Sequence, residues 1–283
     1  MHRLKRSGTP CFTPDSTKLI TSSSNGVLRF DVVTGAFEHQ FEAVSHLSKA
    51  SISPDGSRIA VKSTSGRILV FDLEGTCLLD CKNQREGEGC NLVWTEDGQF
   101  LIDGSWKGAI RQRNAETGEI VMEIASHHVG YLELLPQGRL ATIQTIVGDH
   151  ARSFLAVRNA SDLTPSYQVF FDGYRHTEGI SPLGRFVWSV RPGEVFELAD
   201  SELHLIATWA SDGAGSGYAV AFHPDFREMT CVIRRWQITR LRIPSLEEIQ
   251  SYEVEYPCEA AYSPDGQWLA LGGWKSGKLV RLD

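Results

Sequence analysis

One short phrase recurs seven times along the chain and limits what the chain can fold into. An apolar residue is followed by a small or polar one and then by Pro-Asp-Gly or a close relative, as in Ile52–Gly56 and Tyr262–Gly266. The third position anchors each repeat, at Pro14, Pro54, Glu96, Pro136, Pro182, Pro224 and Pro264. Successive anchors are 40, 42, 40, 46, 42 and 40 residues apart. This period is typical of a propeller blade of roughly 40–45 residues, although helical solenoids have similar periods.

The residues between the anchors distinguish these two classes. Pro-Asp-Gly is a turn sequence, because Pro fixes φ, Asp bonds its own backbone and Gly accepts positive φ. In the first repeat, a β-rich run at Lys18–Thr21 leads to a turn at Asn25-Gly26 and an alternating strand at Val27–Phe30. A third turn at Thr34-Gly35 then leads to a fourth strand. Four strands per repeat predict an all-β fold, a single seven-bladed propeller over residues 1–283.

The two ends of the chain predict how the ring closes. The first anchor lies just after a first strand, whereas the chain ends at Lys278–Asp283, which corresponds to a third strand. The last blade therefore lacks its outermost strand, and the segment left to supply it is His2–Arg6. Full closure removes exposed sheet edges, so we expect the N-terminal segment to pair in the last blade.

With the strands placed, the sequence resembles the WD-repeat propellers. The resemblance covers all seven repeats and rests on the anchor phrase and on segments such as Ser65–Asp72 and Gly104–Arg111. The closing Trp-Asp pair of that family corresponds to Phe30-Asp31 and Phe71-Asp72, and its Gly-His pair to Ser45-His46. Tol-type periplasmic propellers also repeat Ser-Pro-Asp-Gly. The Thr-Gly turn before the fourth strand and the lack of a signal-peptide-like apolar run favour the WD-repeat interpretation.

Aromatic residues give the best functional signal. Trp106 in Gly-Ser-Trp-Lys-Gly and Trp274 in Gly-Gly-Trp-Lys-Ser-Gly occupy equivalent turns, each followed by a lysine, Lys107 or Lys275. Exposed tryptophan beside a cation suits a protein-binding hot spot, although each indole could equally fold back as local packing. The resemblance implies that partners dock on the face bearing these turns. Trp209 is a third candidate for that face.

We therefore predict a non-enzymatic scaffold that binds a protein or peptide partner on the face formed by the inter-blade loops. His46 and Arg85 are weaker candidates for partner contacts. Trp94, Trp188 and Trp268 fall at strand positions of the repeat and are expected in the core.

The alternative is a metal-assisted hydrolase resembling a lactonase. His128 and His176 are expected in connections from a fourth strand to the next blade, and His150 in a turn between second and third strands. These loops share one face of a propeller, where imidazoles could ligate a metal with an open coordination position. Loop histidines more often serve structure, so the main prediction includes no metal and no cofactor.

Composition argues against several other classes. The net charge of −7 disfavours binding to nucleic-acid phosphates. No run of 18 apolar residues occurs, so no membrane partner is expected. Six cysteines are too sparse for a disulfide scaffold, and Cys77, Cys81 and Cys90 lack the spacing of a zinc site. Phosphate-loop, nucleophile-elbow and dinucleotide motifs are missing from the sequence. We expect a cytoplasmic protein.

Overall fold

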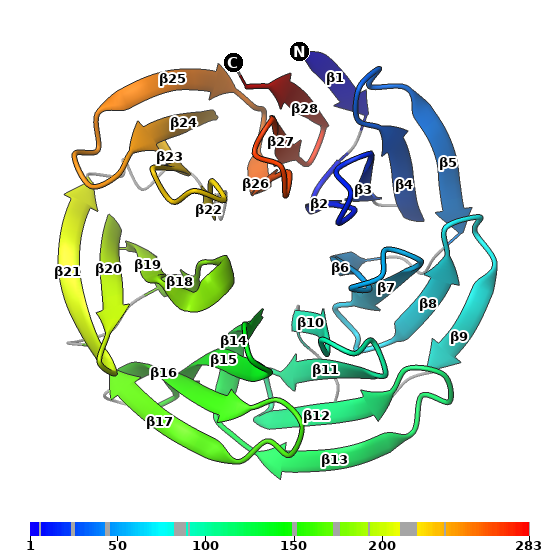
Figure 1. Ribbon diagram of the computed structural model, residues 1–283, viewed down its shortest axis with the longest axis vertical. Coiled ribbons are helices and arrows are strands. Elements are labelled where there is room, and N and C mark those ends of the chain that lie inside the picture. Colours follow the sequence, from blue (N-terminus) through cyan, green and yellow to red (C-terminus); the bar gives the residue numbers. More distant parts are fainter. Residues whose placement is uncertain are drawn as a thin grey trace.

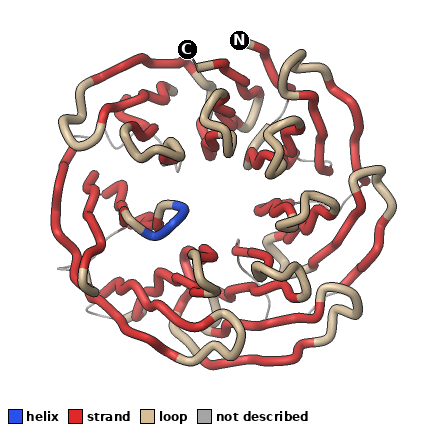
Figure 2. Tube along the Cα trace, viewed as in Figure 1, coloured by secondary structure: helices blue, strands red, loops and turns tan. Residues whose placement is uncertain are grey.

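Seven four-stranded antiparallel sheets stand side by side in a closed ring (Figure 1). This ring confirms the predicted seven-bladed propeller. The structure, a computed structural model, describes residues 1–5, 7–23, 26–42, 46–81, 89, 91–148, 152–171, 176–191, 193–209, 220–234 and 236–282. In each blade the first strand lies nearest the centre of the ring and the fourth at its rim. Nearly all of the traced chain is strand and turn, with one short 3₁₀ segment, η1 (Pro182–Gly184), at the fifth anchor (Figure 2).

Blades 1 to 4 use sixteen consecutive strands. Blade 1 contains β2 (Pro10–Phe12), β3 (Lys18–Ser23), β4 (Gly26–Asp31) and β5 (Phe37–Glu42). Blade 2 contains β6 (Leu47–Ile52), β7 (Arg58–Ser63), β8 (Ile68–Asp72) and β9 (Cys77–Cys81). Blade 3 contains β10 (Asn91–Trp94), β11 (Phe100–Ser105), β12 (Ala109–Asn114) and β13 (Ile120–Ala125). Blade 4 contains β14 (His128–Leu135), β15 (Arg139–Ile146), β16 (Arg152–Asn159) and β17 (Pro165–Phe170).

Blades 5 to 7 complete the ring. Blade 5 contains β18 (His176–Ile180), β19 (Phe186–Arg191), β20 (Gly193–Ala199) and β21 (Glu202–Trp209). Blade 6 contains β22 (Ala221–Phe222), β23 (Glu228–Arg234), β24 (Gln237–Arg242) and β25 (Glu248–Glu253). Blade 7 contains β26 (Pro257–Tyr262), β27 (Trp268–Gly273), β28 (Ser276–Arg281) and, from the start of the chain, β1 (His2–Lys5).

The closure prediction is confirmed by the pairing of β1 with β28. The strands are antiparallel, with Leu4 opposite Gly277 and Arg3 opposite Lys278. The two ends of the chain lie close together at the rim (Figure 1). Leu4 is almost fully buried and packs with Leu279 and with Leu19 of blade 1. The first strand therefore closes the last blade and also joins it to the first. The predicted residue Arg6 lies outside the described residues.

The anchor phrase forms the turn between the first and second strands. In blade 2 the Ser53 hydroxyl donates to the Asp55 carboxylate at 2.5 Å, and the backbone N–H of Ser57 donates to the same oxygen at 3.1 Å. These hydrogen bonds, led by the one from Ser53, lower the pKa of Asp55 to about 2. The same hydroxyl–aspartate bond forms in blades 1, 3 and 7, whereas the anchor phrases of blades 4 and 5 have Gln137 and Leu183 in place of the aspartate.

The core fills the seams between neighbouring blades. One cluster joins Ile20 and Val27 of blade 1 to Ile59 and Val61 of blade 2. Blades are sheets, so alternate residues of their inner strands face opposite neighbours, and each seam is packed like a sheet sandwich. Trp94, Trp188 and Trp268 are all buried, which confirms their predicted place in the core.

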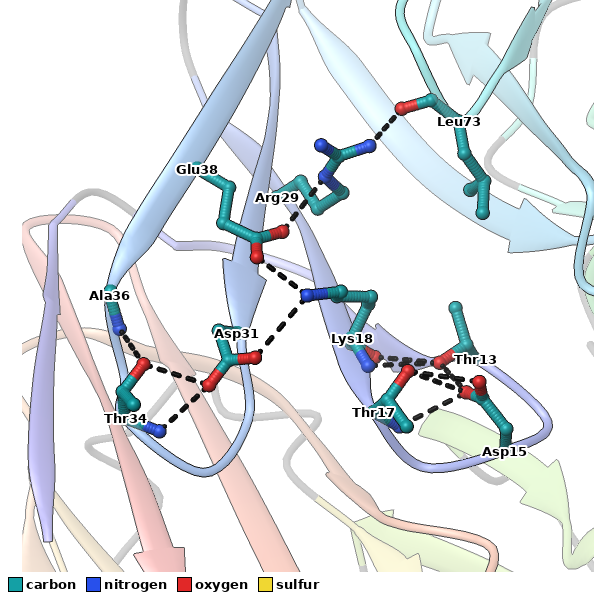
Figure 3. Close-up of polar contacts among 10 residues, drawn as sticks. All are labelled: Thr13, Asp15, Thr17, Lys18, Arg29, Asp31, Thr34, Ala36, Glu38 and Leu73. Atoms are coloured by element: carbon teal, nitrogen blue, oxygen red, sulfur yellow. Dashed lines mark hydrogen bonds and ion pairs between the residues drawn. The ribbon is translucent and has the colours of Figure 1, made fainter.

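Two ionic networks differ sharply in burial. In blade 1, Lys18 donates to Asp31 at 3.2 Å and to Glu38 at 2.5 Å, and Arg29 joins Glu38 to the Leu73 carbonyl of blade 2 (Figure 3). The Lys18 side chain is 29 % exposed.

The second network lies between blades 2 and 3. Lys62 donates to Asp103 at 2.9 Å, and Arg113 donates to the other Asp103 oxygen at 3.0 Å. The Lys62 and Asp103 side chains are 0 % and 1 % exposed. Burial alone would raise the pKa of Asp103, but the two cations outweigh it and hold that pKa below its ordinary value.

Candidate protein-interaction face

One face of the ring carries both predicted tryptophan turns. Because neighbouring strands are antiparallel, turns between second and third strands lie at the same end of the blades as the connections from one blade to the next. We call this the connection face. Trp106 lies in the β11–β12 turn and Trp274 in the β27–β28 turn, with exposed fractions of 39 % and 75 %. They belong to blades 3 and 7, which are not neighbours, so the structure does not bring them together (Figure 1).

Trp274 belongs to an aromatic group at the junction of blades 6 and 7. Its backbone N–H donates to the Tyr256 carbonyl at 3.1 Å. The Tyr256 ring lies 5.4 Å from the ring of Trp236, centroid to centroid. Tyr256 and Trp236 are 43 % and 37 % exposed. We call Trp236, Tyr256, Trp274 and Lys275 the aromatic patch.

Lys275 fixes one side of the aromatic patch. Its ammonium donates to Glu255 at 2.9 Å and lies 5.3 Å from the centre of the Tyr256 ring. The hydrogen bond and the charge of Glu255 raise the pKa of Lys275 above its ordinary value. The lysine therefore stays charged and is held against the aromatic ring rather than free in solvent.

Trp236 and Tyr256 were missed in the sequence, although a signal for Tyr256 exists. The carbonyl of His46 accepts from the Thr64 N–H in blade 2, just as the carbonyl of Tyr256 accepts from the Trp274 N–H in blade 7. Each accepting residue directly precedes the first strand of its blade and has a positive φ, 61° for His46 and 53° for Tyr256. Aligning Tyr256 with the predicted contact His46 would have placed an aromatic ring beside Trp274.

The other predicted contacts have different surroundings. Trp106 stacks on His128, with ring centroids 6.2 Å apart and planes 11° apart, and the backbone N–H of Lys107 bonds to Ser105. Trp209, at the end of β21, is half-buried and belongs to the core cluster between blades 5 and 6. His46 is exposed on the connection face.

Arg85 lies outside the described residues, so its predicted contact is not placed. Trp106 and Trp209 both have packing neighbours, whereas Trp274 combines high exposure with neighbouring exposed rings. The aromatic patch is therefore the strongest candidate among the predicted sites.

A groove of about 550 Å³ opens beside the aromatic patch. It runs between blade 6, through residues 236–237 and 253–255, and blade 7, through residues 1–3 and 276–278. Arg3 and Lys278 lie on the blade 7 side, and Glu253 and Glu255 on the blade 6 side. We call this the seam groove. Trp236 and Glu255 connect it to the aromatic patch.

The histidines of the metal hypothesis are only partly placed. His128 is the first residue of β14 and is not in the preceding connection, so its expected loop position is wrong by one element. Its Nδ1 lies 3.2 Å from the Trp106 carbonyl oxygen. His176 is likewise the first residue of β18 and not in the preceding connection, so its expected loop position is also wrong; its side chain and His150 lie outside the described residues. Among the residues that are described, no group of three or more His, Cys, Asp or Glu side chains could hold a metal ion.

A charged cluster occupies the inner strands instead. Lys49 of β6 lies 3.6 Å from Glu259 of β26, and the Tyr131 hydroxyl donates to Glu133 of β14 at 3.1 Å. Burial raises the pKa of Glu133, and it raises that of the nearby Cys11 thiol to about 12. A thiol with such a pKa stays protonated and is a poor nucleophile. The cluster links blades 2, 4 and 7 electrostatically, whereas burial keeps the Cys11 thiol protonated against the opposing effect of the Lys49 charge on its pKa.

Within the described part of the chain, no helix is long and apolar enough to span a membrane.

Comparisons with known proteins match parts of the sequence and the whole ring. A family profile described as "Anaphase-promoting complex subunit 4 WD40 domain" matches residues 50–135. Eukaryotic translation initiation factor 3 subunit I of Lodderomyces elongisporus is 25 % identical over 134 residues, 41 % of this chain and 38 % of that protein. Meiotic recombination protein rec14 of Schizosaccharomyces pombe is 30 % identical over 76 residues, 27 % of this chain and 25 % of that protein. The matched region thus spans well under half of either relative.

A solved structure from Kuenenia stuttgartiensis hydrazine synthase superposes with a TM-score of 0.83, covering 99 % of this chain and 96 % of that one at 13 % identity. At that identity the likeness concerns the fold alone. The sevenfold phrase, the ring of four-stranded blades and the partial matches to WD-repeat sequences together support a WD-repeat β-propeller.

Proposed function

We propose that this propeller is a non-enzymatic scaffold that binds a protein or peptide partner on its connection face, chiefly through the aromatic patch. The single observation that carries the proposal is Trp274, whose side chain is 75 % exposed and whose backbone is hydrogen-bonded to Tyr256, one of two further exposed rings that pack on each other. Such a grouping differs from the scattered single apolar residues that any surface shows. Tryptophan and tyrosine are enriched among the residues that contribute most to protein–protein binding.

The aromatic patch is also pre-organised. Trp236 and Tyr256 have φ values of 62° and 53°, in the left-handed region that is uncommon for bulky residues. Each such conformation costs on the order of 1–3 kcal/mol, and such residues cluster at functional sites. The Trp274–Tyr256 hydrogen bond joins the two backbones, and the Lys275–Glu255 ion pair holds the ammonium beside the Tyr256 ring. A partner would therefore find the surface already ordered, which lowers the entropic cost of binding.

The names of the similar proteins support an interaction role. Two of them designate a subunit of a larger assembly, initiation factor 3 and the anaphase-promoting complex. Because one fold serves many functions, the identity of this chain's partner does not follow from those names.

A quantitative affinity pull-down tests the proposal. Tagged wild-type protein is compared with Trp274→Ala and with Trp106→Ala, an equally large truncation in the equivalent turn of blade 3. Both turns are at the surface, so both variants are expected to melt close to the wild-type temperature. A protein retained by Trp106→Ala but lost by Trp274→Ala, and shown to bind directly when purified, supports the aromatic patch. Equal retention of every direct partner by both variants would exclude it.

A further inference from the structure

The seam groove has walls of opposite charge. Arg3 and Lys278 occupy directly opposite positions on the paired strands β1 and β28. Like charges in such positions repel, because their Cβ atoms are only about 4.5–5.5 Å apart. Neither cation has an ion-pair partner among the described residues. Two adjacent cations without an anion on a groove wall form a binding position for a carboxylate, which both can reach.

The opposite wall contributes one uncompensated anion. Glu255 is paired with Lys275 at 2.9 Å, whereas Glu253 is exposed and forms no ion pair with a described residue. Glu253 lies at the end of β25, opposite Gln237 of β24. A purely acidic ligand drawn to Arg3 and Lys278 would therefore be repelled by Glu253. A purely basic ligand drawn to Glu253 would be repelled by Arg3 and Lys278.

An extended peptide satisfies both walls if its charges alternate. Successive side chains of an extended strand point to opposite sides, so acidic residues can face Arg3 and Lys278 while basic residues face Glu253. We infer that the seam groove binds an extended peptide segment in which acidic and basic side chains alternate. The inference rests on the proposed scaffold function and names the kind of segment that lies next to the aromatic patch. The exposed ring of Trp236 adds a flat apolar surface where the groove meets the aromatic patch.

Binding of two synthetic peptides separates this arrangement from general charge attraction. The probes are a fluorescein-labelled decapeptide of alternating Glu and Lys and a decapeptide of five Glu followed by five Lys. They have the same composition and net charge. Fluorescence anisotropy is measured at low ionic strength, where partly exposed charges are least screened. We expect the alternating peptide to bind at least tenfold more tightly. Equal binding of the two peptides, or tighter binding of a deca-glutamate peptide, would overturn the inference.

Charge reversal in the groove provides a rescue. Arg3→Glu/Lys278→Glu makes both walls acidic and should abolish binding of the alternating peptide. Adding Glu253→Lys to this variant again gives the two walls opposite charges, with their signs exchanged. The alternating peptide can then bind with its register shifted by one residue. A merely structural role for these side chains gives no such recovery. Arg227→Glu/Arg242→Glu, at positions of blade 6 that are 86 % and 62 % exposed and outside the groove lining, changes the net charge equally; it is the matched control and should leave binding unchanged.

The outcomes distinguish this inference from the proposed function. If Trp274→Ala loses a direct partner but the two peptides bind equally, the scaffold function is supported and peptide binding by the seam groove is refuted.

Discussion

Lys62 and Lys18 permit a direct measurement of what burial does to an ion pair in this propeller. Both lysines lie on the second strand of a blade and both contact aspartate, at 2.9 Å and 3.2 Å. Lys62 is fully buried between blades 2 and 3, whereas Lys18 is 29 % exposed (Figure 3). Replacing each lysine with methionine removes the charge and keeps most of the side-chain volume.

The expected losses of stability differ several-fold. Lys62→Met leaves Asp103 buried with Arg113 as its remaining cation. Removing one partner of a buried ion pair typically lowers the free energy of unfolding by about 3–5 kcal/mol. For a chain of this size, that loss lowers the melting temperature by roughly 6–20 °C. Lys18→Met removes two partly exposed ion pairs, with Asp31 and Glu38, each of which contributes about 0–1 kcal/mol to the free energy of unfolding.

The pH dependence gives a second readout. Because the folded-state pKa of Asp103 is lowered, its ionised form stabilises the fold above the unfolded-state pKa of about 3.9. That contribution is lost as the pH falls through the lowered folded-state pKa. The gap in melting temperature between wild type and Lys62→Met should therefore narrow in acid.

Thermal unfolding followed by circular dichroism at pH 7 and at pH 4 and below measures both effects. The triple variant Lys62→Met/Asp103→Leu/Arg113→Met removes every charge and is expected to melt at or above the temperature of Lys62→Met, since apolar replacements of buried ion networks are often neutral or stabilising. A Lys62→Met protein that melts within 1 °C of Lys18→Met would refute the argument, because burial would then have no effect.

Three further predictions concern the closure, Trp209 and the inner charged cluster. The Leu4 side chain is 1 % exposed, so Leu4→Ala should lower the free energy of unfolding by about 2–5 kcal/mol. Deleting residues 1–5 should lower the melting temperature further, and thermal unfolding measures both effects. Gly193→Ala would place a Cβ 2.6 Å from the Trp209 indole, so we expect lower stability and altered tryptophan fluorescence, whereas Gly138→Ser in an open turn should leave that fluorescence unchanged. Burial raises the pKa of Glu133, so the ionised form of this side chain opposes folding. Glu133→Gln should therefore raise the melting temperature at pH 7. Below the unfolded-state pKa of about 4.3, the variant and the wild type should have the same melting temperature.

The sequence predicted the ring because the anchor turn depends on local chemistry. Thr13, Ser53 and Ser263 each donate a hydroxyl proton to the aspartate two residues later, so the same short pattern forms the same turn wherever it occurs. The anchor phrase, with or without this aspartate, occurs once per blade, so counting its copies predicted seven blades. The closure by β1 was predictable because the C-terminal repeat has three strands rather than four, so the N-terminal segment was expected to supply the fourth.

The buried ion network was not predictable in the same way. Lys62 directly follows the apolar run Ile59 to Val61 in β7, and the sequence does not show that its partner is 41 residues away in the next blade. The pairing depends on which residues of adjacent blades face one seam, and this is fixed only when the sheets have been packed. A lysine at a buried strand position is a signal that some partner exists, since an unpaired buried charge is too costly.

The aromatic patch shows the same limit for the candidate site. Trp274 was identified from its own turn, but Trp236 belongs to a different blade and Tyr256 to the connection between blades 6 and 7. Tyr256 lies next to Trp274 because the connection from blade 6 crosses to the first strand of blade 7 at this point, and the Trp236 ring packs on that of Tyr256. Trp106, in the equivalent turn of blade 3, meets His128 instead.

Ring closure explains why the seam groove lies where it does. The fourth strand of blade 7 is the four-residue β1, which places Arg3 opposite Lys278 on the side that faces blade 6. The deeper part of this seam is filled by apolar residues, among them Val254, Leu271 and Val280. The core is therefore complete without Arg3 and Lys278, so reversing their charges should leave the melting temperature nearly unchanged while abolishing peptide binding. A large loss of stability in Arg3→Glu/Lys278→Glu would show instead that these cations hold the closing strand in place.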